Sequence, residues 1–224
     1  MSLSEKEKNK IVLRYSERFN EFGYSPKTLG WDKGKQGLRF DVLTSGVDLK
    51  NKSVLDIGCG FGDLNKVLKI KFDKYKYTGI DVVDCLIQQG DGIFSSSNIK
   101  LICGDFLNYN FEEKFDYAIA SGIFNFKLSD MDNYSYIESV IVKALNICSI
   151  GIAFDFLSDK VDYQYEHTFH SSPEEILRIA YKYSRKVILR NDYMPFEFAI
   201  YIYKDDTFDP QNTIYNSYKD FIKL

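Results

Sequence analysis

Short apolar runs alternate with helical stretches from residue 53 onward. The runs are rich in β-branched residues and mostly continuous, which is typical of strands buried on both faces of a parallel sheet. Between them, apolar residues recur at i, i+3 and i+4, the spacing of amphipathic helices. This alternation predicts a doubly wound α/β sheet. The expected strands cover residues 53–57, 76–81, 99–105, 115–121 and 147–156, and the expected helices cover residues 63–72, 82–94 and 132–146.

The pattern also predicts elements on both sides of this region. Residues 4–22 carry one apolar stripe, which predicts an amphipathic helix, and a glycine-containing loop separates it from a short helix near residues 38–43. Residues 205–224 are polar and aromatic, and their pattern predicts no element.

A helix and two strands are expected late in the chain. In residues 171–181, Ser172 fits the N-cap position and Glu175 fits the residue that closes a capping box. Apolar runs follow at 185–192 and 196–204, joined by a short link. A short link favours a hairpin, so one strand should be antiparallel to the rest.

Composition and charge narrow the class of protein. The chain has 224 residues, is 45% hydrophobic and has a formal net charge of -3, without a basic stripe that would follow a phosphate backbone. No apolar run approaches the ~20 residues of a membrane span. The four cysteines have no zinc-ligand spacing, so we expect buried free thiols, no metal and a cytoplasmic protein.

One turn of the expected sheet is rich in glycine. In "VLDIGCGFGDL" (54–64), an apolar strand ends at Asp56, and Gly58, Gly60 and Gly62 precede a helix. Glycine loses more conformational freedom on folding than other residues, so three in five positions suggest a ligand close to the backbone. A mononucleotide P-loop requires a lysine and a Ser or Thr after the glycines, and this stretch lacks both.

Two cofactor classes remain for this turn. A nicotinamide dinucleotide requires G-x-G-x-x-G, whereas the third glycine comes one residue early here, and Asp56 and Asp63 would repel a pyrophosphate. S-adenosylmethionine carries positive charge and an adenosine but no phosphate, so the same carboxylates favour it.

Side chains that suit such a ligand follow the next strands. Asp81 comes a little over ~20 residues after Gly58, the spacing at which an acid reaches a ribose. Asp105 can accept a hydrogen bond from an adenine amino group, and Phe106 can stack on its ring. Ser121 ends the fourth strand near the point where strand order reverses, where a reactive methyl group should lie.

The segments "VLDIGCGFGDL", "YTGIDVV", "ICGDF" and "FDYAIASGIFN" resemble successive motifs of class I S-adenosylmethionine-dependent methyltransferases, over roughly residues 50–157. The "ASGIFN" segment resembles one bacterial subgroup of small members. The resemblance implies a Rossmann-like, mostly parallel seven-stranded sheet whose last strand is antiparallel. We expect the chain to divide into N-terminal helices and a lid loop (1–46), an S-adenosylmethionine-binding methyltransferase domain (47–204) and a C-terminal tail (205–224).

The resemblance assigns parts of the cofactor to residues. It implies that Asp56 and the first two glycines hold the methionine portion, that Asp81 holds the ribose, and that Asp105 and Phe106 hold the adenine. In the N-terminal segment, Arg39 could pair with the cofactor carboxylate and Trp31 could close over it. The expected cofactor-binding residues are Asp56, Gly58, Cys59, Gly60, Asp81, Val82, Gly104, Asp105, Phe106, Ser121, Arg39 and Trp31.

Methyl transfer mainly requires a nucleophile held about 3 Å from the methyl group in a site that excludes water. The released thioether, S-adenosylhomocysteine, needs no acid to depart, and a base is required only for a weakly acidic nucleophile such as a hydroxyl. His167 and His170, the two histidines of the chain, and Asp155 are the candidate bases. Segments 1–45, 124–133 and 157–172 should shape the acceptor pocket.

A small molecule or a glycan precursor is the favoured acceptor. No Asn/Asp-Pro-Pro-aromatic run follows the fourth strand, and the charge balance disfavours a nucleic acid partner. An NAD(P)-dependent oxidoreductase and a cofactor-binding protein without methyl transfer remain as alternatives. Decarboxylative or cyclising chemistry with the same cofactor is a further alternative. The sequence does not identify the accepting atom or the oligomeric state.

Overall fold

The chain alternates strands and helices through most of its length in the computed structural model, which describes residues 2–31, 34–204 and 208–223. The elements up to β4 are α1 (Glu5–Phe22), α2 (Gln36–Leu43), β1 (Lys52–Ile57), α3 (Leu64–Lys71), β2 (Tyr75–Asp81), α4 (Asp84–Ile93), β3 (Ile99–Cys103) and β4 (Phe115–Ala120). They are followed by α5 (Asn133–Ile147), β5 (Cys148–Leu157), α6 (Pro173–Ala180), β6 (Val187–Arg190), β7 (Glu197–Tyr203), β8 (Phe208–Asp209), β9 (Ile214–Tyr215) and the 3-10 helix η1 (Asn216–Lys223).

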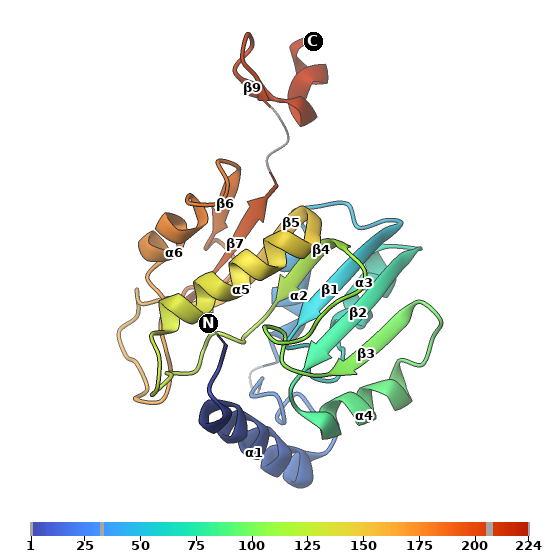
Figure 1. The fold of residues 1–224 in the computed structure, drawn as a ribbon, viewed down its shortest axis with the longest axis vertical. Coiled ribbons are helices and arrows are strands. Elements are labelled where there is room, and N and C mark those ends of the chain that lie inside the picture. The colour runs from blue at the N-terminus through green and yellow to red at the C-terminus, as the bar shows by residue number, and fades with distance from the viewer. Residues whose placement is uncertain (1, 32–33, 205–207, 224) are drawn as a thin grey trace.

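A seven-stranded sheet with the order β3-β2-β1-β4-β5-β7-β6 forms the centre of the molecule (Figure 1). β1 pairs in parallel with β2 on one side and β4 on the other, so the strand order reverses at β1. β7 is inserted between β5 and β6 and is antiparallel to both. The expected doubly wound, mostly parallel fold with an antiparallel last strand is confirmed.

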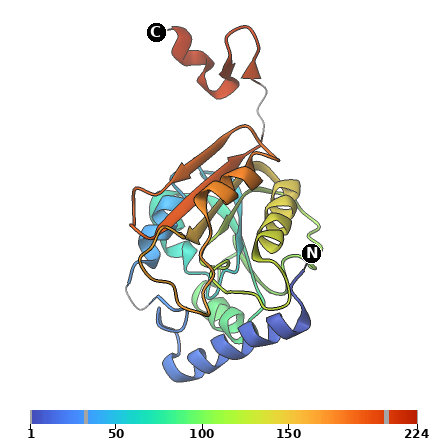
Figure 2. The ribbon, with the colours of Figure 1, turned by 90° about the vertical axis from the view of Figure 1, so that its left-hand side faces the viewer.

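The central strands bury side chains on both faces, as their continuous apolar runs predict. Leu55 packs in a cluster with α5 and α6, whereas its neighbour Val54 packs in a second cluster with α2 and α3. Successive residues of a strand point to opposite faces, so helices cover both sides of the sheet. The turned view separates these layers (Figure 2).

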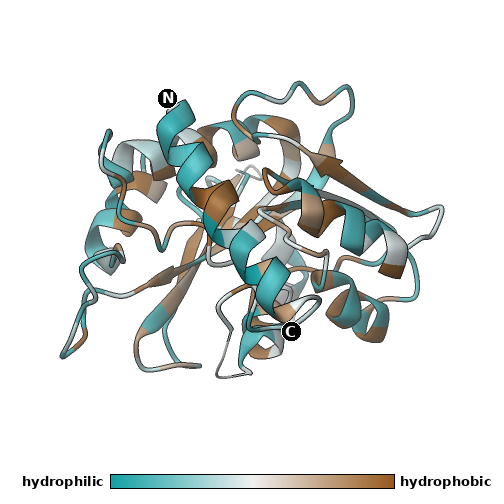
Figure 3. Ribbon diagram, turned by 90° about the horizontal axis from the view of Figure 1, so that it is seen from below, coloured by the Kyte–Doolittle hydropathy of each residue, from teal (hydrophilic) through white to brown (hydrophobic). Residues whose placement is uncertain are grey.

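Helix α1 lies across the carboxyl ends of the parallel strands. Seen from below, it crosses in front of the sheet and is mostly hydrophilic on the side that faces the viewer (Figure 3). Ser4 caps the helix by accepting from the N–H of Glu7. The helix is tied to the loop after β4, because Ser129 donates its backbone N–H to the Glu7 carboxylate at 3.0 Å and Lys6 pairs with Asp130 at 3.1 Å.

Two local expectations are wrong. Ser172 caps α6 through the N–H of Glu175, but the Glu175 carboxylate does not close a capping box. It pairs with Arg178 one turn along, and the Ser172 N–H donates to the Tyr134 hydroxyl instead. Among the cysteines, Cys59 and Cys148 are buried as expected, whereas Cys85 is half-buried and Cys103 is exposed.

The tail holds the β8–β9 hairpin and η1, and Figures 1 and 2 both show it extending beyond the β6 edge of the sheet. Lys186 lies against it, with Nζ at 3.2 Å from the Ser217 hydroxyl. Residues 205–207 and 224 of the expected tail, and residues 1, 32 and 33 of the expected N-terminal segment, lie outside the described residues. None of the helices in the described ranges is long and apolar enough to cross a membrane.

Candidate functional site

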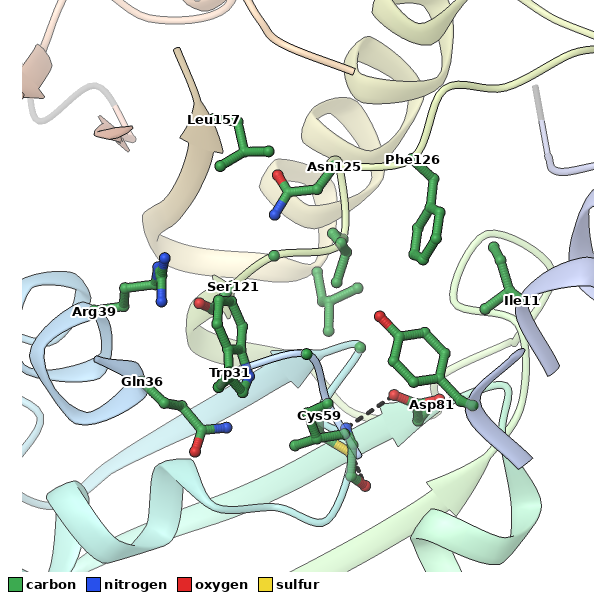
Figure 4. A pocket seen from close by; sticks show the side chains of 18 of the residues that line it. Ile11, Trp31, Gln36, Arg39, Cys59, Asp81, Ser121, Asn125, Phe126 and Leu157 are labelled. Atoms are coloured by element: carbon green, nitrogen blue, oxygen red, sulfur yellow. Dashed lines mark hydrogen bonds between the residues drawn. The ribbon is translucent and has the colours of Figure 1, made fainter. Parts of the chain in front are cut away.

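A cavity of about 600 Å³ lies at the carboxyl ends of the parallel strands, beneath α1 (Figure 4). That volume is in the range of roughly 300–1,000 Å³ typical of small-molecule sites. Each of the three expected lid segments, 1–45, 124–133 and 157–172, contributes residues to its walls. The end of the β6–β7 loop and the first residue of β7 supply a further wall, residues 194–197, which the sequence did not indicate.

The glycine-rich turn after β1 forms the floor of the cavity. Gly58, Gly60 and Gly62 have positive φ angles of 70°, 54° and 82°, which side chains other than glycine rarely adopt. A Cβ atom on Gly58 would lie 2.2 Å from Cγ2 of Ile123. The Gly58 N–H donates to the Ile80 carbonyl at 2.8 Å, so the turn is anchored to β2. Gly58 and Gly60 both line the cavity, so the backbone of this turn forms part of its surface.

Asp56, at the end of β1, lies beneath the turn. Its side chain is buried and accepts a hydrogen bond from the Tyr77 hydroxyl at 2.7 Å. Burial raises the pKa of Asp56 to about 7, the Tyr77 bond opposes this shift, and the carboxylates of Asp81 and Asp63 add to it. A positive charge in the cavity would therefore favour the ionised form.

Asp81, at the end of β2, joins two neighbouring backbone segments. Its carboxylate accepts hydrogen bonds from the N–H groups of Gly60 and Val83, each at 2.9 Å. Burial raises its pKa, and the backbone donors oppose that shift. Asp81 lines the cavity beside Cys59, as expected (Figure 4).

Asp105 and Phe106 follow β3 and line the far side of the cavity with Val82 and Gly104. The Asp105 carboxylate accepts from the Leu107 N–H at 3.0 Å, so it caps its own loop. It also lies 3.5 Å from Nζ of Lys8 on α1. Phe106 is buried, and the Lys143 ammonium lies 5.2 Å from its ring centre.

Helix α1 covers this side of the cavity with Ile11, Arg14 and Tyr15. Burial raises the pKa of Tyr15 to about 12, so its hydroxyl remains protonated and can donate a hydrogen bond at neutral pH. Arg14 lies over the Phe126 ring, 5.3 Å from its centre, which connects α1 to the loop after β4.

Asp155 was expected as a candidate base, and the structure places it behind the cavity wall instead. It is 2% exposed and accepts hydrogen bonds from the Ser121 hydroxyl at 2.5 Å and the Gly122 N–H at 2.7 Å. Burial raises its pKa to about 6, and these two bonds oppose the shift. Ser121 lines the cavity. Because its proton points to Asp155, the Ser121 oxygen presents lone pairs elsewhere.

Trp31 and Arg39 both line the cavity, as expected, but Arg39 already has a partner. Its guanidinium forms a bidentate ion pair with Glu197 at the start of β7, and both side chains are 11% exposed. The Trp31 ring stacks on it, with centroid and guanidinium carbon 4.1 Å apart. Trp31 also lies against Gly122, where a Cβ atom would be 2.8 Å from Cη2 of the ring.

The two histidines lie in different places. His167 is exposed and lines the mouth of the cavity, with its ring 5.7 Å from that of Tyr165. His170 is not among the described lining residues. Its Nδ1 donates to the Ser158 carbonyl at 2.7 Å, and its Nε2 lies 3.2 Å from the Thr168 hydroxyl. Both ring nitrogens of His170 are therefore engaged in holding its own loop.

Asn125 is a cavity residue that the sequence motifs did not single out, although it belongs to the "ASGIFN" segment. Its side-chain oxygen is shielded from solvent and has no hydrogen-bond partner. Figure 4 shows its amide projecting into the space between Leu157 and Ser121. Glu197 was missed as well, because it follows Arg39 by 158 residues and no local pattern joins them.

The polar groups of the site do not form a metal centre within the described ranges. No group of three or more His, Cys, Asp or Glu side chains is placed there to hold an ion. The described residues can supply hydrogen bonds, charge stabilisation and aromatic walls that exclude water.

Comparisons with known proteins agree with this geometry. Residues 54–141 match a family model described as a methyltransferase domain. Rv1506c of Mycobacterium tuberculosis, classed by name as a methyltransferase, is 31% identical over 159 residues, which cover 68% of this chain and 93% of that protein. Malonyl-[acyl-carrier protein] O-methyltransferase of Acetivibrio thermocellus is 31% identical over 87 residues, or 38% of this chain and 31% of that protein.

A solved structure shares the fold. Magnesium protoporphyrin IX methyltransferase from Synechocystis PCC 6803 with bound S-adenosylmethionine has a TM-score of 0.64 and 11% sequence identity, and the match covers 92% of this chain and all of that one. These matches favour the S-adenosylmethionine interpretation of the glycine turn over the nicotinamide one.

Proposed function

This chain belongs to the class I S-adenosylmethionine-dependent methyltransferases, and we propose that it methylates a small molecule bound beyond Ser121 in the same cavity. The observation that carries the proposal is the row of carboxylates, Asp56, Asp81 and Asp105, that lines one wall of the cavity at the ends of β1, β2 and β3. We call this wall, with its glycine turn, the cofactor end.

The residues of the cofactor end fit S-adenosylmethionine in charge and shape. The buried carboxylate of Asp56 and the half-buried carboxylate of Asp81 stand beside a glycine turn whose backbone lines the cavity, which suits a cationic ligand. Asp56 with Gly58 and Gly60 would hold the methionine portion. When bound, the cofactor supplies a methyl group on a positively charged sulfur.

The remaining cofactor contacts follow the order of the strands. Asp81 would accept from the ribose hydroxyls while it keeps the Gly60 turn in place. Phe106 offers a ring face to the adenine, and Asp105 offers a carboxylate oxygen to its amino group. Tyr15 would cover the nucleoside from α1 and exclude water.

The opposite part of the cavity, which we call the acceptor end, is lined by Trp31, Asn125, Leu157, His167 and residues 194–197. Its walls are largely apolar and aromatic, which suits a small molecule or a glycan precursor with an apolar portion. The net charge of -3 supports an acceptor other than nucleic acid.

Of the three candidate bases, His167 is the one whose side chain borders the acceptor end. We retain it as the base for a hydroxyl acceptor. Asp155 instead has a supporting role, because its bonds to Ser121 and Gly122 keep the loop after β4 in the shape that forms the wall. His170 holds the loop before α6.

Calorimetric titration tests the proposal. S-adenosylmethionine and S-adenosylhomocysteine should each bind the purified chain at one site, whereas NAD and NADP should give no heat of binding. Incubation with methyl-labelled cofactor and a fractionated small-molecule extract should then transfer label to a small product. Binding of NADP but not of S-adenosylmethionine would overturn the proposal, and cofactor binding without label transfer to any fraction would favour a binding protein.

A further inference from the structure

The backbone at Asn125 is fixed by hydrogen bonds, whereas its side-chain oxygen has no partner. Its backbone carbonyl accepts from the Phe169 N–H at 2.9 Å, and the carbonyl of the next residue, Phe126, accepts from Nδ2 of Asn133 at 2.7 Å. Phe126 also forms an isolated bridge with Thr168. These bonds fix the loop, so the unpartnered amide is not a consequence of a loose backbone.

A shielded carbonyl oxygen without a donor is disfavoured in a folded protein. Oδ1 of Asn125 is such an atom, and the residue lines the acceptor end close to Ser121 (Figure 4). Because a carbonyl oxygen only accepts hydrogen bonds, the missing partner must be a donor. A donor in the cavity reaches this oxygen only if the amide turns toward the cavity, and an N–H or O–H group of the acceptor molecule would then supply the partner.

Carboxylates near this point are already occupied. Glu197 is paired with Arg39, and Asp155 accepts from Ser121 and Gly122. Among the described residues that line the acceptor end, His167 is the remaining candidate base, and it is exposed at the mouth. A neutral amine attacks through its lone pair and needs no base, whereas a hydroxyl must lose its proton.

The walls around Asn125 favour a ring. Trp31, Phe126, Tyr165 and Phe196 contribute aromatic faces or edges to the same cavity. A protonated aliphatic amine would meet the positive charge of the cofactor, and it would lack a lone pair. An aromatic amine is neutral at pH 7 and places an apolar ring against these walls.

We propose that Asn125 binds the methyl acceptor, and that this acceptor is a neutral aromatic amine whose N–H donates to Oδ1 of Asn125. The inference rests on the proposed function. The amine nitrogen uses its lone pair to form the N–CH₃ bond as the C–S bond breaks, and the electron pair of that bond stays on sulfur. The positive charge passes from sulfur to nitrogen, and the resulting ammonium releases one proton to water.

Binding of simple probes to the protein loaded with S-adenosylhomocysteine tests this inference. Aniline, phenol and benzoate have a ring of one size but carry an amine, a hydroxyl and a carboxylate. With ¹⁵N-labelled protein, aniline should shift the Asn125 side-chain amide signal, which is identified by its loss in Asn125→Ala. Phenol and benzoate should bind more weakly and move that signal less.

The Asn125→Ala variant should weaken aniline binding by roughly ten- to a hundredfold, the size expected when a buried hydrogen-bonding group is removed. Its affinity for S-adenosylhomocysteine should stay within about twofold of the wild type. Asn146→Ala, on the exposed side of α5, is the matched control and should change neither affinity.

The inference is overturned if aniline does not bind the loaded protein, if Asn125→Ala leaves aniline binding intact, or if phenol or benzoate moves the Asn125 signal more than aniline does. If the wild type does not bind S-adenosylhomocysteine, the proposed function itself is contradicted. A His167→Ala variant distinguishes the two acceptor types. Methyl transfer to an amine should persist in this variant, because an amine needs no base, whereas methyl transfer to a hydroxyl should be lost.

Discussion

The hydroxyl of Ser121 donates a hydrogen bond to the carboxylate of Asp155 across 2.5 Å, and the next backbone N–H, that of Gly122, donates to the same carboxylate. This side chain at the end of β5 thereby fixes the loop that leaves β4. Asp155, which was expected to be a catalytic base, therefore supports the cavity wall from behind.

Replacing Asp155 tests that supporting role. Asp155→Ala leaves two buried donors without an acceptor, and we expect the free energy of unfolding to fall by about 2–4 kcal/mol. Ser121→Ala removes one of the two bonds and should cost about 1 kcal/mol. Urea denaturation of both variants measures these changes. Equal stability of Asp155→Ala and the wild type would contradict the assignment.

Arg39 and Glu197 should depend on each other for stability. Each side chain is only 11% exposed, so Arg39→Met or Glu197→Gln alone leaves a largely desolvated charge without its partner, and we expect a loss of about 3 kcal/mol for each. The double variant should lose much less than the sum of the two. A double-mutant cycle from denaturation curves measures the coupling, and strictly additive losses would show that the pair contributes nothing.

Trp31 should report on the cavity by fluorescence, because it is the single tryptophan of the chain and packs against Gly122. Gly122→Ala places a methyl group where the ring lies and introduces a side chain at a φ of 75°. We expect a shift in the emission maximum and a stability loss of about 1–3 kcal/mol. Gly92→Ala is the control, since no atom lies within 4 Å of its Cβ position. An unchanged spectrum in Gly122→Ala would argue against this packing.

Asp56 should make stability depend on pH. Its pKa is raised to about 7 by burial, so between about pH 4 and 7 the folded chain holds a proton that the unfolded chain has released. Stability should therefore fall as the pH rises through this window. Asp155, with its pKa raised to about 6, adds to the slope. The carboxylate of Asp81 acts in the same direction.

Asp56→Asn keeps an acceptor for the Tyr77 hydroxyl but removes the titration. Its stability relative to the wild type should rise between pH 5 and pH 8, as measured by urea denaturation at both values. An identical pH dependence in the two proteins would show that Asp56 is not the titrating group.

The sheet and the cofactor end were predictable from local sequence patterns. Continuous apolar runs such as that around Val54 and Leu55 indicate strands buried on both faces, and the carboxyl ends of parallel strands meet at one edge. Acids at those ends, such as Asp81, therefore had to lie near the glycine turn. The first inference rests on the periodicity of apolar residues and the second on the direction of the strands. Both can be recognised in short segments of the sequence.

The acceptor end was less predictable, because it depends on contacts between distant segments. Nothing near Arg39 in the sequence indicates Glu197 as its partner. The position of Asp155 at a strand end did not reveal that it faces Ser121 rather than the cavity, and the scarcity of histidine did not distinguish His167 from His170. Long-range packing decides which polar group faces a ligand.

The central claim is that carboxylates at the ends of neighbouring strands hold a cationic nucleoside, and calorimetry of Asp81→Ala with S-adenosylmethionine tests it most directly. Asp84→Ala is the matched control, since Asp84 is exposed three residues further on. We predict that Asp81→Ala lowers the affinity at least tenfold and that Asp84→Ala leaves it unchanged. Equal affinities of Asp81→Ala and the wild type, with both proteins folded, would contradict the account.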